Sequence, residues 1–146
     1  IFAYTAARLA AGVIDFNGVG PAYPIEEIVL FRQDMIKAQV DGTTIKGIVS
    51  SVSDPFGSIA LNILSSDFKA AGCRHGDHLH VTLSDQGTVY FDQDVLYEKS
   101  FGYVDVGEPI LFDSSTNYIE LGINQGNFRD TFRVKAGSDH TFVIVK

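Results

Sequence analysis

Two polar stretches of the sequence hold the side chains best suited to binding a small molecule. Residues 53–58 read Ser-Asp-Pro-Phe-Gly-Ser after a β-branched run, and residues 114–127 combine hydroxyl, aromatic, amide and glycine residues, with Phe101 between the two stretches. Such groups at strand ends can bind a flat heterocycle with a zwitterionic tail, because ligand pockets combine an apolar wall with a few placed polar groups. Taken alone, the first stretch favours an ordinary corner between two strands with a buried Phe56, since Asp-Pro and Gly are general turn residues.

Three histidines, His75, His78 and His80, are candidates for a metal site. His78 and His80 lie two residues apart and would share one face of a strand, so both could bind the same ion. The third ligand is missing from this pattern, because Asp77 would point the other way. Histidines that face solvent or a partner are the simpler interpretation, and we expect no metal.

Two other candidates are weaker. Asp92 and Asp94 suggest calcium, but they lack the glycine and the later glutamate of a calcium loop, which favours a solvated turn. Cys73 precedes Arg74 and His75, and a nearby cation lowers the pKa of a thiol. Residues adjacent in sequence seldom face one another, so this spacing does not indicate a nucleophile.

Composition excludes several classes of protein. The chain has 146 residues, enough for one domain with its own core. Its net charge is −7 and its basic residues are scattered, so we expect no binding to nucleic acid. No apolar run approaches the roughly 20 residues that span a bilayer. The single cysteine fits a reducing compartment, and we expect a cytoplasmic protein.

The elements that must position these residues are mostly strands. Alternating or β-branched runs separated by turn residues predict strands over the ranges 44–52, 58–63, 78–83, 88–91, 108–112, 117–123 and 141–145. A hairpin is expected at Asp41-Gly42, a short helix before Gly72, and one or two helical turns within residues 124–132. The pattern predicts an all-β fold, an antiparallel barrel or sandwich with short helices.

The N-terminus differs from the rest of the chain. Residues 6–11 are rich in strong helix formers, and Gly12 is a natural stop, so a helix is expected there. No cap or loop precedes it, which suggests the last helix of a missing first domain. We therefore expect residues 1–32 to be that helix with a connector, and residues 33–146 to be a C-terminal β-barrel domain.

Two motifs resemble those of the S-adenosyl-L-methionine (SAM) hydroxide adenosyltransferases, relatives of fluorinase and chlorinase. Asp-Pro-Phe-Gly at 54–57, followed by Asn62-Ile63, is similar to the family corner Asp-x-Phe-Gly-Asn…Asn-Ile. Residues 115–127 are similar to the family's Ser-x-Gly-Tyr-Leu-Glu-Ile-Ala-x-Asn-x-Gly-Asn. Phe2-Ala3 and the Ala-rich helix resemble the end of the family's first domain, so the resemblance covers nearly the whole chain.

The resemblance implies a two-domain enzyme, usually a homotrimer. Its site lies between the first domain of one subunit and the C-terminal barrel of a neighbour. Hydroxide would attack the ribose 5′ carbon of SAM and release adenosine and L-methionine, with no cofactor beyond that substrate. The hydroxide-activating and ribose-binding side chains would all lie upstream of Ile1, so no catalytic residue is expected here. This chain alone should be inactive.

The resemblance also implies the roles of single residues at the amino-acid end of the substrate. Asp54 would meet the methionine ammonium, because a carboxylate attracts a cation. Ser115 would meet the methionine carboxylate.

The same resemblance implies an adenine subsite. Phe56 and Phe101 would flank the base, with Ser58 and the backbone near Gln125 and Gly126 at its polar edge. Ser58 stands where the family has Asn, and a hydroxyl cannot offer the paired donor and acceptor of an amide. Ser58 thus favours the alternative of a non-catalytic adenosyl-binding or assembly domain. A relative of the 5′-halogenases is a further alternative, on which this chain does not bear because the resemblance assigns halide choice to the first domain.

Overall fold

The computed structural model describes residues 2–30, 37–135 and 140–145. It divides the chain into two compact units, Ile1–Leu30 and Phe31–Lys146. The domain boundary expected between residues 32 and 33 lies outside the described residues.

The first unit contains one α-helix, α1 (Phe2–Ala10), and two short 3-10 helices, η1 (Asn17–Val19) and η2 (Ile25–Glu27). The expected N-terminal helix is confirmed. It ends at Ala10, and the turn after it is closed by Gly12, whose φ is +66° and whose N–H donates to the Leu9 carbonyl at 3.0 Å. Within this unit none of the residues of α1 is buried.

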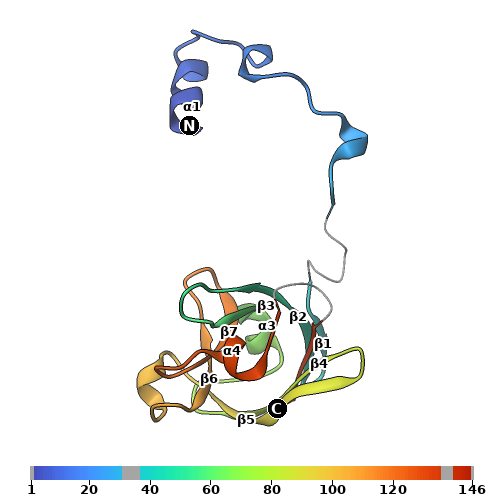
Figure 1. Cartoon of the computed structure of the whole chain (residues 1–146), viewed down its shortest axis with the longest axis vertical. Coiled ribbons are helices and arrows are strands. Elements are labelled where there is room, and N and C mark those ends of the chain that lie inside the picture. The colour runs from blue at the N-terminus through green and yellow to red at the C-terminus, as the bar shows by residue number, and fades with distance from the viewer. Residues whose placement is uncertain (1, 31–36, 136–139, 146) are drawn as a thin grey trace. The chain divides into compact units, whose positions relative to one another are not determined.

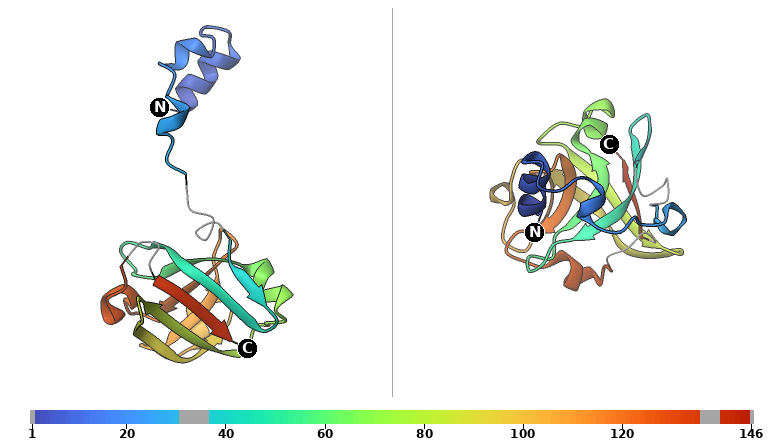
Figure 2. Two further views of the ribbon diagram at one scale, coloured as in Figure 1. Left: turned by 90° about the vertical axis from the view of Figure 1, so that its right-hand side faces the viewer. Right: turned by 90° about the horizontal axis from the view of Figure 1, so that it is seen from above.

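The second unit is one curled sheet. Its strands are β1 (Gln39–Asp41), β2 (Thr44–Val52), β3 (Ile59–Leu64), β4 (His78–Asp85), β5 (Thr88–Tyr97), β6 (Pro109–Asp113), β7 (Tyr118–Ile123) and β8 (His140–Val145). The strand order is β1-β2-β3-β7-β6-β5-β4-β8, and β8 also pairs with β2, so the sheet curls back on itself (Figure 1; Figure 2). The short helices are α3 (Ser65–Ala70), η3 (Phe101–Tyr103) and α4 (Phe128–Phe132). No helix in the described ranges is long and apolar enough to cross a membrane.

The prediction of a purely antiparallel sheet is wrong at one strand pair. β5 and β6 run parallel, with Leu96 opposite Ile110 and Tyr97 opposite Leu111. Residues 98–108 connect these strands through η3. A connection of this length can return the chain to the same end of the sheet, which a two-residue hairpin turn cannot do. The mostly β class is correct, but the sheet is mixed.

Alternation along β3 and β7 separates the core from an outer face. Ile59, Leu61, Ile119 and Leu121 are fully buried in the core. Because successive side chains of a strand point to opposite faces, their neighbours lie on the outer face of the sheet. The outer-face residues considered below are Ser58, Ala60, Phe112, Glu120 and Gly122.

Asn62 of the first motif has a structural position. It is buried, and its side-chain oxygen accepts a hydrogen bond from the Ile48 N–H at 2.8 Å. The β2–β3 register shifts between Val49 and Ser51. Asn62 thus satisfies a buried backbone donor next to this irregularity, where leaving it unpaired would be costly.

Candidate functional site

The chemistry suggested by the sequence converges on a cavity of about 720 Å³ in the second unit. Its lining residues are Ser53, Pro55, Phe56, Ser58, Phe101, Phe112, Glu120, Ile123, Asn124, Gln125, Gly126 and Asn127. Five of the seven predicted binding residues line it: Phe56, Ser58, Phe101, Gln125 and Gly126. The other two, Asp54 and Ser115, do not. The lining residues come from the corner before β3, from η3, β6 and β7, and from the loop after β7; β3, β7 and β6 are neighbours in the sheet (Figure 1).

The corner before β3 is held by its own backbone. The Ser53 N–H donates to the Ser58 carbonyl, and the Gly57 N–H donates to the Ser53 carbonyl, both at 2.8 Å. The Asp54–Pro55 peptide bond is cis. This arrangement leaves the Phe56 side chain 72% exposed at the cavity. The alternative of an ordinary corner with a buried Phe56 is therefore wrong.

Helix α4 is fastened to this corner from the other end of the sequence. The Asn127 side-chain oxygen caps the helix by accepting from the Asp130 N–H at 2.9 Å. The Arg129 N–H donates to the Gly57 carbonyl at 3.0 Å. Asn127 also packs against Gly57, where a Cβ would lie 1.9 Å from the Asn127 Oδ1. Glycine at 57 is required for this contact.

Arg129 also pairs with Asp54, which the sequence did not indicate. The Arg129 Nη1 lies 2.5 Å from the Asp54 Oδ1, and the Asp54 side chain is 79% exposed. Its Nε lies 2.9 Å from Asp130 Oδ1. The edge of the cavity next to Ser53 and Pro55 thus carries a carboxylate and a guanidinium side by side.

Because Gly122 has no side chain, the Phe101 ring and the Ser58 hydroxyl can both lie close to it. A Cβ at Gly122 would lie 3.0 Å from the Phe101 Cε1 and 3.1 Å from the Ser58 Oγ. The Phe101 and Phe112 rings are 4.9 Å apart between centroids, at 55°. The missing side chain at 122 lets Phe101 lie close against β7, with Ser58 at its edge.

The loop after β7 forms the polar wall. Asn124 Nδ2 donates to the Val104 carbonyl at 2.9 Å, and the Gly107 N–H donates to the Asn124 carbonyl at 2.8 Å. Gln125 has a φ of +54°. The loop is thereby anchored to the segment after η3, while Gln125 and Gly126 face the cavity.

Glu120 also lines the cavity, although it is not among the predicted binding residues. Burial raises the pKa of its carboxyl, and a hydrogen bond with the Ser114 side chain partly offsets that effect. The usable signal was its alternation with Ile119 and Leu121, which places an acid on the outer face between two core residues.

Ser115 lies at the opposite end of β7 from this loop. It belongs to the turn between β6 and β7, in which the Asn117 N–H donates to the Ser114 carbonyl at 3.0 Å. Its predicted role toward a ligand carboxylate stays a prediction.

The histidine cluster does not form the site imagined from the sequence. His75 Nε2 bonds Asp113 Oδ2 at 2.8 Å, whereas His80 lies between Asp94 and Asp92, at 2.8 and 3.1 Å. The hydrogen bond to Asp94 is the main cause that raises the pKa of His80. Within the described ranges, no three His, Cys, Asp or Glu side chains are grouped to hold a metal ion. Cys73 is buried in the core.

Asp113 is the centre of a second polar network. It accepts hydrogen bonds from Ser65 Oγ, from Tyr97 OH at 2.9 Å and from His75. Burial alone would raise the pKa of Asp113, but these three bonds together hold the pKa below its ordinary value of 3.8. They join the ends of β5 and β6 to the start of α3.

Asp113→Asn should lower the free energy of unfolding by about 1–2 kcal/mol at pH 7, because an amide replaces a charged acceptor. A carboxyl with a lowered folded pKa stabilises above its unfolded pKa, and this contribution is lost as pH falls through the folded value. The difference in the free energy of unfolding between wild type and Asp113→Asn should therefore be constant near neutrality and shrink below about pH 4. Urea titrations at several pH values measure it, with Asp105→Asn as the exposed control; a gap that grows on acidification would contradict the assignment.

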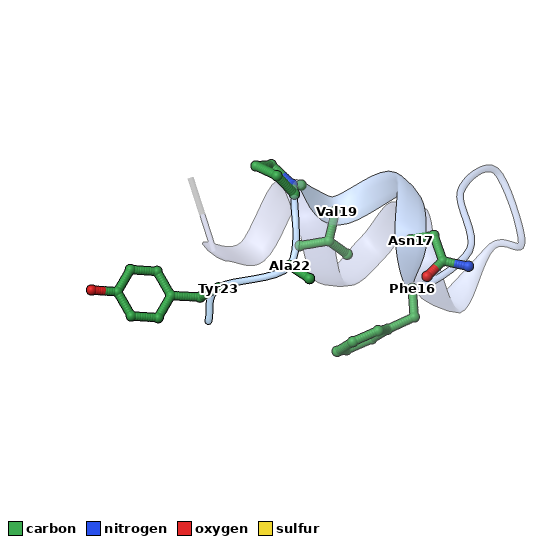
Figure 3. A pocket seen from close by; sticks show the side chains of 7 residues that line it. Phe16, Asn17, Val19, Ala22 and Tyr23 are labelled. Carbon is green, nitrogen blue, oxygen red and sulfur yellow. The ribbon is translucent and has the colours of Figure 1, made fainter. Parts of the chain in front are cut away.

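The first unit has a groove of its own, of about 480 Å³, lined by Phe16, Asn17, Val19, Gly20, Pro21, Ala22 and Tyr23 (Figure 3). It has no charged side chain in its lining. The cavity of the second unit has a carboxylate, hydroxyls and amides in its lining, and is the better candidate for ligand recognition.

Comparisons with known proteins show the family of this chain. Residues 51–141 match the family model described as SAM hydroxide adenosyltransferase C-terminal domain. Fluorinases from Actinoplanes sp., Actinopolyspora mzabensis and Nocardia brasiliensis are 29%, 27% and 29% identical, each over 92% of this chain. The matches cover 44%, 44% and 43% of those proteins. The chain therefore spans less than half the length of these relatives.

Two solved structures are similar in fold. An uncharacterized conserved protein from Thermotoga maritima matches with a TM-score of 0.73 and 27% identity, over 100% of this chain and 51% of that chain. A conserved hypothetical protein from Thermus thermophilus matches with a TM-score of 0.58 and 23% identity, over 99% of this chain and 50% of that chain. The second likeness concerns the fold alone.

Proposed function

The chain belongs to the SAM hydroxide adenosyltransferase family as its C-terminal domain, and from this premise we propose that it supplies the adenosyl-binding half of an enzyme that hydrolyses SAM. Hydroxide attacks the ribose 5′ carbon, the bond to the sulfonium sulfur breaks, and adenosine and L-methionine leave. The observation that supports this most is the single cavity that gathers Phe56, Phe101, Ser58 and the Gln125–Gly126 loop.

The adenine subsite is built on Phe101. Its ring is fixed between Gly122 and Phe112, whereas Phe56 is exposed and can close on the other face of a flat base. Stacking of a base on an aromatic side chain contributes about 1–3 kcal/mol. Ser58 Oγ and the backbone of the Gln125–Gly126 loop are the polar groups at its edge.

The methionine end of SAM is a zwitterion, and the cavity's rim carries a matching pair of charges. Asp54 would take the ammonium, as expected from the sequence. Arg129 lies at the same rim and is paired with Asp54 at 2.5 Å and with Asp130 at 2.9 Å, so Ser115 stays the predicted partner of the methionine carboxylate. Charge-assisted bonds of this kind are the stronger ones.

The remaining parts of the active site come from outside this chain. The cavity is open on the outer face of the sheet, and its described lining offers no base for activating water other than Glu120. We assign the hydroxide-activating residues to a first domain and the shared site to a homotrimer, with SAM as substrate and no cofactor. The single cysteine of the sequence supports a cytoplasmic location.

The test is turnover by the full-length protein. SAM in halide-free buffer should yield adenosine and methionine in equal amounts, and the isolated 146-residue chain should yield neither. A 5′-halogenated nucleoside formed only with added fluoride or chloride would favour the halogenase alternative, which the fluorinase relatives support. Adenosine binding without turnover would favour a non-catalytic binding domain, which Ser58 in place of Asn supports.

A further inference from the structure

Glu120 differs from every other side chain around the cavity. Among the described lining residues it is the one with a formal charge. The rest of the lining is aromatic, aliphatic, hydroxyl or amide, and Arg129 and Asp54 lie outside it. A carboxylate that is partly removed from water in such surroundings is costly unless it is paired.

The neighbours of Glu120 leave its carboxylate open toward the ligand space. Directly across the two adjacent strands are Phe112 on β6 and Ala60 on β3. Side chains directly opposite on one face are in contact range. Ala60 is too short to cover the acid, and the Phe112 ring, which contacts Phe101, forms an aromatic wall.

Burial raises the pKa of Glu120, and among the described residues the hydroxyl of Ser114 is the group whose hydrogen bond lowers it. Ser114 is neutral, and no cationic side chain of the described chain contributes. A hydroxyl satisfies part of a carboxylate's hydrogen-bonding capacity but does not neutralise its charge. A ligand that carries a positive charge would supply the counter-charge that the described part of this chain does not provide.

We propose that Glu120 is a specificity-determining residue that selects ligands carrying a positive charge next to the adenosine, above all the sulfonium of SAM. Phe112, directly opposite Glu120 on β6, reinforces this preference, since aromatic rings attract onium groups. This inference rests on the proposed function. Glu120 thereby distinguishes SAM from neutral thioethers of nearly the same shape, such as the demethylated S-adenosyl-L-homocysteine.

The position along the sheet fits such a role. Glu120 is two residues along β7 from Gly122, where Phe101 and Ser58 meet, so about 7 Å separates the two positions. This displacement runs along β7 away from the loop 123–127 and toward the Ser114–Ser115 turn, the end at which the resemblance places the methionine carboxylate. It places the acid beside the adenine subsite rather than under the base.

The test measures affinity for three stable probes with the full-length protein. Sinefungin carries an ammonium in place of the methylsulfonium and cannot lose methionine, S-adenosyl-L-homocysteine is neutral at sulfur, and adenosine lacks the tail. Wild type should prefer sinefungin over S-adenosyl-L-homocysteine by roughly tenfold, the size of one charge-assisted contact. Glu120→Gln should bring this ratio close to one and leave adenosine affinity within about twofold, because the base does not contact the acid.

Glu108→Gln is the matched control, since Glu108 is exposed and lies outside the cavity lining. It should keep the wild-type ratio. Because burial raises the pKa of Glu120, protonation on acidification should reduce the ratio in wild type and in Glu108→Gln, but not in Glu120→Gln. A purely structural role for Glu120 would change stability and leave both the ratio and its pH dependence as in wild type.

The outcomes separate the two proposals. If wild type binds none of the probes, the proposed function fails and the inference fails with it. If adenosine binds but Glu120→Gln keeps the wild-type ratio, the inference alone is overturned. Circular dichroism checks the fold of the variant. If Glu120→Gln does not fold, the pH dependence of wild type decides. A wild-type ratio of sinefungin to S-adenosyl-L-homocysteine affinity that stays constant from pH 8 through the titration of the carboxyl then overturns the inference.

Discussion

Gly57→Ala is expected to lower the free energy of unfolding by about 2–3 kcal/mol and to disrupt the cavity. The backbone at 57 has a φ of +69°, and an L side chain in this region costs roughly 1–2 kcal/mol. The new Cβ would also lie 1.9 Å from the Asn127 Oδ1. Asn127 would have to move and would give up its cap of α4, a loss of about 1 kcal/mol.

Gly42→Ala is the matched control for this change. Gly42 has a φ of +59°, but no atom lies within 4 Å of its added Cβ. Gly42→Ala should therefore lower the free energy of unfolding only by the cost of an L side chain at positive φ. Urea unfolding of both variants gives the difference, which isolates the Asn127 contact. Equal losses in the two variants would show that α4 is not held against the corner as described.

Phe101→Ala should weaken adenosine binding by the full-length protein about tenfold to a hundredfold, the range of one lost base–aromatic stack. The ring is held by Gly122 and Phe112 before any ligand arrives, so its removal takes away a preformed surface. Calorimetry with adenosine measures the effect directly.

Tyr103→Ala provides the comparison from the same 3-10 helix. Tyr103 is exposed and lies outside the cavity lining, so its removal should leave adenosine affinity unchanged. If Phe101→Ala binds as tightly as Tyr103→Ala, the adenine subsite lies elsewhere.

Local patterns were sufficient to predict most strands and one wall of the site. Alternation along β3 and β7 fixed which residues face the core, because a strand's side chains have a period of two. The same alternation places Glu120 on the outer face, between the core residues Ile119 and Leu121. Turn residues located the corner at 53–58, but not the exposure of Phe56, because burial depends on what packs above the corner.

Contacts between distant segments could not be predicted in the same way. Arg129 pairs with Asp54 because α4 returns to the corner, and the position of α4 follows from the curled sheet rather than from any local pattern. The parallel pairing of β5 with β6 depends on how residues 98–108 cross the sheet, for which the sequence has no short signal. The histidines were grouped by spacing alone, whereas the fold gives His75 and His80 separate acidic partners.

Hydrogen exchange of the full-length protein with and without adenosine tests the central claim most directly. The account predicts that adenosine slows amide exchange within this chain at residues 53–58, around Phe101 and in the loop 123–127, and leaves the β4–β5 hairpin unchanged. Adenosine binding that protects other segments while these three exchange at their free rates would contradict the assignment of the adenosyl site to this domain.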